Sequence, residues 1–368
     1  MLLIFLSVLI VPQPAGAEYV SATIAVGSNP LDVAVNPVTN KTYVTNFDSQ
    51  NVTVIDGKTN TAVSVAVGEG PGPHSPGPVA VNTVTNKIYV GNRYSGSVTI
   101  IDGATNATTT VAAGSCPIAI AVNPVTNKIY VANYYSANVT VIDGASNTTV
   151  TVASGTSPLG VAVNPVTNKI YVTNQDSASV TVIDGSTNAT ETVAAGSGPG
   201  GVAVNPATNK IYVSNYWGNT VTVINGSTNS TSTIAAGIYP GLVAVNPVTN
   251  RIYVINGGNN NVAVIDGVTD TVTTLVATDL GPRAISVNPI TNRIYVANRG
   301  NVSPNVTVID GDTHSTTTVI VDYGPVALAV NPITNKIYVV KNVGMSVSVI
   351  DGQKMLLPLS MLAHTPAP

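Results

Sequence analysis

Short runs of β-branched residues alternate with short polar turns along almost the whole chain. Between residues 160 and 195 the runs read GVAVN, KIYVTN, SVTVIDG and ATETVAA, and they are separated by PVT, QDSA and STN. Runs of Val, Ile and Thr bounded by turn residues are typical of β-strands, and no segment shows the 3.6-residue period of a helix. The pattern predicts an all-β protein whose unit has four strands, here called a, b, c and d.

This four-strand unit recurs along the chain. The asparagine that ends strand a returns at spacings of 46, 41, 41, 41, 41, 42 and 43 residues, namely at Asn36, Asn82, Asn123, Asn164, Asn205, Asn246, Asn288 and Asn331. A period near 41 residues lies in the range of β-propellers. We therefore predict a single eight-bladed β-propeller; the alternative is seven blades with one loosely attached unit.

The strand count indicates how the ring closes. Strands a, b and c have eight copies, but strand d occupies only the seven gaps between them. The missing copy is TIAVG at residues 23–27, ahead of the first strand a. We expect this N-terminal strand to complete the last blade, whose own strands end at Gly352. Closure removes exposed sheet edges, and it needs no disulfide in a chain whose single cysteine is Cys116.

The turns predict which surface varies. In NPVTNK the second Asn tolerates the left-handed backbone of a tight turn, and in IDGSTN the Asp-Gly pair is expected to serve the c–d hairpin. These a–b and c–d turns are nearly constant and emerge on one face of an up-and-down blade. The b–c and d–a loops emerge on the other face and differ from copy to copy. Function is therefore expected on the b–c and d–a loop face.

Charged residues recur on the constant face. Lys or Arg begins strand b, and Asp ends strand c in every copy except the one with Asn225. Antiparallel pairing brings the two positions together, so we expect a cross-strand ion pair in each blade. The alternative is a charged binding ring, which is disfavoured because the positive and negative charges at these positions cancel. The basic positions are Lys41, Lys87, Lys128, Lys169, Lys210, Arg251, Arg293 and Lys336.

Aromatic residues divide into two groups. Eight tyrosines share one position in strand b and are interpreted as packing residues: Tyr43, Tyr89, Tyr130, Tyr171, Tyr212, Tyr253, Tyr295 and Tyr338. Most of the others lie in b–c or d–a loops, as exposed binding anchors often do. The candidate binding residues are Phe47, Tyr94, Tyr134, Tyr135, Tyr216, Trp217 and Tyr239, with Asp176 in the loop QDSAS; Tyr323 is also in a d–a loop. We expect the pairs Tyr134–Tyr135 and Tyr216–Trp217 to flank a groove around QDSAS.

Composition narrows the ligand classes. The chain has 44% hydrophobic and 8% charged residues and a net charge of -3. Charges expected on the loop face are mixed, which disfavours nucleic acid: they are Asp32, Asp48, Glu69, Asp176, Asp279, Asp322, Arg93, Arg283, Arg299 and Lys341. A neutral face rich in amides and aromatics suits a protein or glycan partner better.

Catalytic signals are weak. The histidines His74, His314 and His364 have no metal-pair spacing, and HExxH, GxSxG, P-loop and CxxC motifs do not occur. Propellers that bind a quinone cofactor repeat a tryptophan docking motif, which the single Trp of this chain cannot supply. No motif for a haem ligand is seen either. We expect no cofactor and no metal. The alternative is a lactonase- or lyase-like enzyme at the channel mouth, with a calcium site built on Asp48 or Asp176, or with His74 as a general base.

The N-terminus resembles an export signal. An apolar run of about ten residues precedes Ala15, Gly16 and Ala17, which form a small-x-small cleavage pattern. The run is too short to span a membrane. We expect a signal peptide at 1–17, one propeller domain at 18–352 and a tail at 353–368. The mature protein is then secreted, periplasmic or on the cell surface, without a membrane span and as a monomer.

Two copies of strand b contain the literal word YVTN, at residues 43–46 and 171–174. Residues 19–352, with eight copies of both turn motifs, resemble the YVTN-repeat β-propeller family. That resemblance implies an exported or surface-layer propeller, mostly without assigned chemistry; some relatives resemble lactonase-type or nucleic-acid-binding propellers. The favoured function is non-enzymatic recognition, or a cell-surface scaffold, with a protein or glycan bound at the b–c and d–a loop face.

Overall fold

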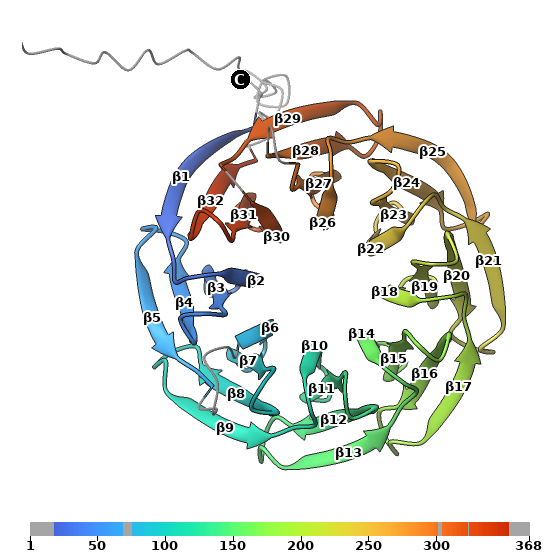
Figure 1. The fold of residues 1–368 in the computed structure, drawn as a ribbon, viewed down its shortest axis with the longest axis horizontal. Coiled ribbons are helices and arrows are strands. Elements are labelled where there is room, and N and C mark those ends of the chain that lie inside the picture. Colours follow the sequence, from blue (N-terminus) through green and yellow to red (C-terminus); the bar gives the residue numbers. More distant parts are fainter. Residues whose placement is uncertain (1–17, 69–75, 301–303, 323, 353–368) are drawn as a thin grey trace, which may run out of the picture.

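The protein is an eight-bladed propeller. The structure, a computed structural model, describes residues 18–68, 76–300, 304–322 and 324–352. Within them, 32 strands form eight four-stranded antiparallel sheets arranged in a ring (Figure 1). The predicted architecture is confirmed, and the alternative with seven blades is wrong.

The blades are numbered 1 to 8 from the first strand a. Strands a line the channel: β2 (Pro30–Asn36), β6 (Pro76–Asn82), β10 (Pro117–Asn123), β14 (Pro158–Asn164), β18 (Pro199–Asn205), β22 (Pro240–Asn246), β26 (Pro282–Asn288) and β30 (Pro325–Asn331). Strands b follow: β3 (Lys41–Asn46), β7 (Lys87–Asn92), β11 (Lys128–Asn133), β15 (Lys169–Asn174), β19 (Lys210–Asn215), β23 (Arg251–Asn256), β27 (Arg293–Asn298) and β31 (Lys336–Lys341). Strands c are β4 (Asn51–Asp56), β8 (Ser97–Asp102), β12 (Asn138–Asp143), β16 (Ser179–Asp184), β20 (Thr220–Asn225), β24 (Asn261–Asp266), β28 (Asn305–Asp310) and β32 (Ser346–Asp351). The outer strands d are β5 (Ala62–Ala66), β9 (Thr108–Ala112), β13 (Thr149–Ala153), β17 (Thr190–Ala194), β21 (Thr231–Ala235), β25 (Thr271–Ala277), β29 (Thr316–Ile320) and, for blade 8, β1 (Tyr19–Ala25).

The N-terminal strand closes the ring, as predicted. Strand β1 pairs antiparallel with β32, from Tyr19 opposite Asp351 to Ala25 opposite Ser346. Glu18 also reaches into blade 7: its Oε1 lies 3.3 Å from Nη1 of Arg293, and Thr317 Oγ1 donates to its Oε2 at 3.4 Å. The start of β1 therefore ties blade 8 to its neighbour.

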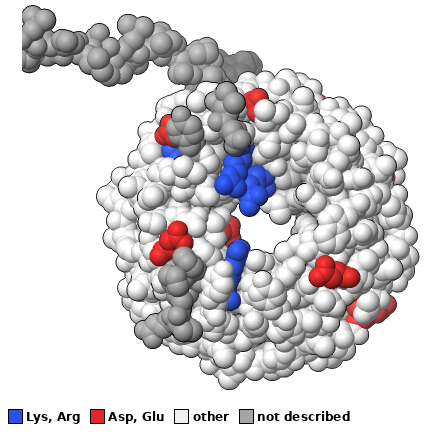
Figure 2. Space-filling model, viewed as in Figure 1, with Lys and Arg blue, Asp and Glu red and all other residues white. Residues whose placement is uncertain are grey.

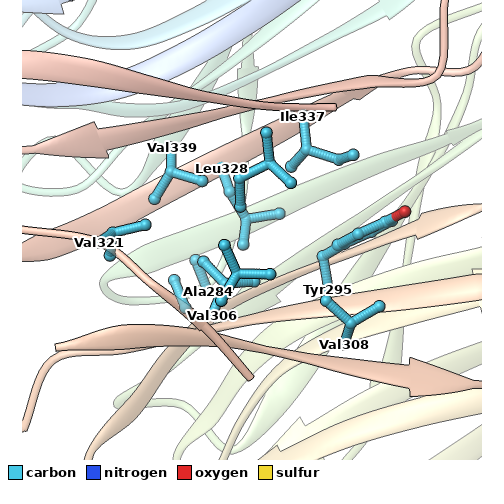
Figure 3. Packing of buried hydrophobic residues seen from close by; sticks show 11 residues of the cluster. Ala284, Tyr295, Val306, Val308, Val321, Leu328, Ile337 and Val339 are labelled. Atoms are coloured by element: carbon cyan, nitrogen blue, oxygen red, sulfur yellow. The ribbon is translucent and has the colours of Figure 1, made fainter. Parts of the chain in front are cut away.

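The hydrophobic core lies between blades. Strands b are buried almost along their whole length, whereas each strand d buries at most one residue. Figure 3 shows one such interface, where Tyr295 and Val308 of blade 7 pack with Ile337 and Val339 of blade 8. The strand-b tyrosines are fully buried, so their interpretation as packing residues is confirmed.

A buried asparagine joins each blade to the next. In blade 4, Asn164 Oδ1 accepts hydrogen bonds from the N–H groups of Val166 (3.1 Å) and Thr167 (3.4 Å), while its Nδ2 donates to Asn209 Oδ1 of blade 5 at 2.8 Å. One side chain thus holds its own turn and the neighbouring blade. The bond recurs around the whole ring, from Asn36 to Asn86, Asn82 to Asn127, Asn123 to Asn168, Asn164 to Asn209, Asn205 to Asn250, Asn246 to Asn292, Asn288 to Asn335 and Asn331 to Asn40.

The turn chemistry is confirmed for NPVTNK and corrected for IDGSTN. The second Asn of NPVTNK has a left-handed backbone, with φ of 54° at Asn168. In the c–d turn the left-handed residue is Asn188, at 62°, rather than the glycine. Gly185 is needed for a different reason, because a Cβ there would collide with the side chain of Asn168.

The ion pair expected in every blade is wrong. Lys41 lies opposite Asp56 in the strand register, but its Nζ donates to the carbonyl of Gly103 in the next blade at 2.6 Å. Six lysines make this contact between blades: Lys41, Lys87, Lys128, Lys169, Lys210 and Lys336. The cross-strand ion pair forms at the arginines, between Arg251 and Asp266 (3.4 Å) and between Arg293 and Asp310 (3.9 Å). A long Lys side chain reaches past its strand partner to a free carbonyl.

Replacing buried Asn164 by Ala is expected to lower the free energy of unfolding by about 1–3 kcal/mol, because the half-buried side-chain carbonyl of Asn209 loses its donor and the turn loses its acceptor. Urea denaturation measures the change. The matched control is Val166→Ala in the same turn, whose side chain is 74% exposed and should have little effect. Equal stabilities of the two variants would contradict the structural role of the asparagine.

Deleting residues 18–28 removes the closing strand and leaves the edge of β32 unpaired. We expect the cooperative thermal transition to disappear, or the protein to aggregate, since an open strand edge pairs with other chains. Calorimetry and light scattering test this, with Tyr19→Ser as a control that keeps the strand. An unchanged melting temperature after the deletion would show that β1 does not hold the ring.

Acidification should weaken the c–d turns. In six of these turns, two backbone N–H groups hold the pKa of the Asp carboxyl below its usual 3.8, as at Asp143, Asp184 and Asp266. A lowered folded pKa contributes stability above the unfolded value and loses it as pH falls below about 4. The double variant D143N/D184N should show a shallower loss in urea midpoints measured from about pH 6 to pH 2.5. The same slope in both proteins would contradict the turn contribution; Asn225 already occupies this position in blade 5.

Candidate functional site

The b–c and d–a loops lie side by side on one face, as predicted from the turn pattern. The N–H of Tyr134 in a b–c loop donates to the carbonyl of Cys116 in a d–a loop at 2.9 Å, and Phe47 bonds Asn29 in the same way at 3.0 Å. The asparagine ring is at the other end of the blades. The variable loops therefore surround one mouth of the central channel.

A large hollow occupies this mouth. Its volume is about 1220 Å³, and strands a from blades 3 to 8 contribute to its wall. Figure 2 shows the opening at the centre of the ring, with basic side chains gathered at its rim. The lining includes Arg93, Ile118, Leu159, Gln175, Tyr216, Tyr239, Leu242, Leu280, Arg283 and Arg299.

A smaller hollow adjoins the large one. It has a volume of about 440 Å³ and lies over blades 2 to 4. Arg93, Ile118, Leu159 and Gln175 line both hollows. The other lining residues are Tyr94, Ser115, Cys116, Tyr134 and Tyr135. The shared wall makes the two hollows parts of one recessed surface.

Five of the predicted aromatics divide between these hollows. Tyr134 and Tyr135 meet edge to face, with ring centroids 5.2 Å apart, and Tyr134 Oη donates to Gln175 Oε1 at 3.3 Å. Tyr216 stacks on Tyr239, with centroids 5.0 Å apart and ring planes at 17°. Tyr134 thus contacts Gln175, the first residue of the loop QDSAS.

Several predicted site residues lie elsewhere. Trp217 is 53% exposed but packs beside Gly198 and lines neither hollow. Asp176 accepts a hydrogen bond from Ser157 Oγ at 2.5 Å and is also outside both linings. Phe47 meets Tyr94 edge to face at 5.9 Å. Tyr323, Glu69 and His74 fall outside the described residues.

Charges on the loop face are separated rather than mixed. Arg93, Arg283 and Arg299 line the large hollow, and its described lining contains no carboxylate. The acidic groups are engaged elsewhere: Asp322 pairs with buried Lys341 at 2.9 Å, and Asp279 accepts from Asn305 at 2.7 Å. The sequence interpretation of cancelling charges therefore missed a basic rim.

The three arginines have different surroundings. Arg93 lies near Asp32, whose carboxylate accepts the N–H groups of Val33 and Val79 and whose pKa is raised by loss of solvent. The charge of Arg93 is thus partly balanced. Partial burial is the main cause that lowers the pKa of Arg283, and the nearby charge of Arg299 lowers it further. Arg283 and Arg299 are therefore close enough to repel one another.

A comparison of the repeats would have revealed this pair. Arg283 occupies the second position of strand a, where the other blades have apolar residues or glycine. Arg299 follows strand b directly, as Arg93, Tyr134, Gln175 and Tyr216 do in their blades. Positions that depart from the repeat therefore locate the channel mouth better than the aromatic residues alone do.

The geometry of a metal site is not seen among the described residues. No group of three His, Cys, Asp or Glu side chains there is placed to hold a metal ion. His314 lies in a c–d turn, on the face opposite the hollows. The described part of the chain also has no helix of the length and apolarity needed to cross a bilayer.

Solved structures share the fold. The chain is similar to hydrazine synthase of Kuenenia stuttgartiensis (TM-score 0.61, 20% identity, 78% of this chain and 96% of that chain). It is similar to a chain of a mitotic checkpoint complex (TM-score 0.63, 16% identity, 81% and 95%) and to the dihydro-haem d1 dehydrogenase NirN in complex with DHE (TM-score 0.67, 16% identity, 83% and 69%). Identities this low show the propeller fold alone. No family model and no curated protein sequence matches the chain.

Proposed function

We propose that this protein is an exported, non-enzymatic recognition propeller that binds a protein or glycan partner in the recess of its loop face. The observation that carries the proposal is the pair of adjoining hollows at the channel mouth, lined by exposed tyrosines and arginines. Aromatic and Arg side chains are the usual anchors of binding sites. The opposite face repeats nearly the same a–b turn in all eight blades and a similar c–d turn in blades 1 to 7, and it offers no comparable variation.

The size of the recess favours a segment of a large partner. Small-molecule sites usually occupy roughly 300–1,000 Å³ and enclose their ligand. The large hollow, at about 1220 Å³, exceeds that range and continues into a second hollow. One similar structure belongs to a multi-protein checkpoint assembly, so the fold is compatible with protein binding.

The YVTN-repeat family remains part of this proposal. Eight copies of both turn motifs, and the YVTN words at 43–46 and 171–174, support it. The export pattern at 1–17 supports a secreted, periplasmic or cell-surface location. These points support the proposed location of the protein, whereas the loop face supports its proposed binding role.

Replacing Tyr135 or Tyr216 by Ala should weaken binding at least roughly tenfold, because exposed aromatic anchors typically contribute about 2 kcal/mol or more. Glycan and octapeptide arrays probed with the purified mature chain provide the measurement. Val166→Arg places a bulky charge on the opposite face and should leave binding unchanged.

Three outcomes would contradict the proposal. Binding lost in Val166→Arg but retained in both Tyr variants would place the site on the other face. Absence of any wild-type binding on either array would argue against recognition. Turnover of lactones or cyclic esters by the wild type, lost in His74→Ala, would favour the enzyme alternative.

A further inference from the structure

Arg283 and Arg299 form an adjacent pair at the rim of the large hollow. The N–H of Arg299 donates to the carbonyl of Gly281 at 2.9 Å, which places Arg299 beside the start of β26 and hence beside Arg283. Both residues keep part of their surface exposed, and both line the hollow. Backbone pairing of blade 7 thus holds the two guanidinium groups on one side of the channel mouth.

The blade fold does not require these arginines. The residues at the position of Arg283 in the other blades are Leu31, Gly77, Ile118, Leu159, Gly200, Gly241 and Val326. The residues at the position of Arg299 are Phe47, Arg93, Tyr134, Gln175, Tyr216, Gly257 and Asn342. Blade 7 alone has Arg at both positions. The pair is therefore a local feature of the mouth rather than part of the repeated scaffold.

The pair has no acidic counterpart among the described residues. No ion pair joins Arg283 or Arg299 to a described carboxylate, whereas Lys341 and Arg293 both have one. The whole chain has a net charge of -3, yet the described lining of this hollow is basic. Two neighbouring cations in a partly desolvated recess repel one another, and a bound anion relieves that repulsion.

Exposed apolar side chains share the lining of the hollow with the pair. Leu280 is 61% exposed, and its carbonyl accepts the N–H of Gly300, the residue after Arg299, at 2.9 Å. Leu242 is 47% exposed in the same lining. A polyhydroxylated sugar gains little from exposed Leu side chains, but apolar side chains of a peptide bury surface there.

We propose that Arg283 and Arg299 are the anion subsite of a peptide groove, binding a carboxylate of an acidic, apolar segment from a partner protein. Guanidinium groups hold carboxylates through paired hydrogen bonds. The neighbouring Leu or Phe side chains of the peptide pack on Leu242 and Leu280. The inference rests on the proposed function and deepens it by selecting a peptide over a glycan.

The test uses the mature chain and three sets of fluorescent octapeptides. One set combines Asp or Glu with Leu or Phe, a second replaces the acids by Lys, and a third replaces the apolar residues by Ser. Oligogalacturonate and neutral cello-oligosaccharides are the glycan probes. Fluorescence anisotropy should show preferential binding of the acidic, apolar set, weakening between about 50 and 300 mM NaCl because exposed charges are screened.

The decisive variant is R283Q/R299Q, which should weaken that binding at least roughly tenfold. The matched control is R251Q, which removes one Arg charge on the opposite face, where Arg251 pairs with Asp266. Its affinity should equal that of the wild type. Thermal melts verify that each variant is folded.

Several results would overturn the inference. These are unchanged affinity in R283Q/R299Q, preference for the Lys set, tighter binding of oligogalacturonate than of any peptide, or no binding of the acidic, apolar set. Glycan binding that depends on Tyr216 and ignores the Arg variant would leave the proposed function intact. Binding that no loop-face variant alters would reject both.

Discussion

The hydrogen bond from one buried asparagine to the next blade is the contact on which the ring depends. The asparagine that ends strand a accepts hydrogen bonds from its own turn with its side-chain oxygen and donates to the neighbouring blade with its side-chain amide. Local turn formation and assembly of the ring therefore depend on one side chain. Eight such bonds run around the ring, and the last, from Asn331 to Asn40, joins the final blade to the first. A buried amide is costly to leave unpaired, which makes each bond dependent on correct neighbour placement.

This arrangement divides the molecule into two faces with separate tasks. The asparagine ring and the lysine contacts between blades occupy one face, and the buried tyrosines fill the interfaces behind it. The loops at the opposite face are therefore free to differ without changing how blades meet. That freedom permits Arg283 to stand where other blades have Leu, Ile, Val or Gly, and it allows Tyr216 to stack on Tyr239.

Prediction from sequence worked where the repeat itself specifies which strands pair. Alternating strands and turns, a period near 41 residues and the missing strand d led to eight blades and to closure by β1. It failed at Lys41, whose strand partner Asp56 is correct in register although its Nζ bonds Gly103 of the next blade. A strand pattern specifies which residues are opposite within a sheet, but it does not specify which neighbouring sheet a long side chain will reach.

The sequence by itself determined the number of blades, the closing strand and the identity of the variable face, because each follows from repeats and turn chemistry read along the chain. Only the tertiary structure decided which loop residues share a recess. Arg93 and Arg299 are far apart in sequence, and both line one hollow because the ring brings its blade ends to a common channel. Trp217, adjacent to Tyr216, packs outside that hollow. Side-chain direction and ring curvature, rather than sequence position, decide that difference.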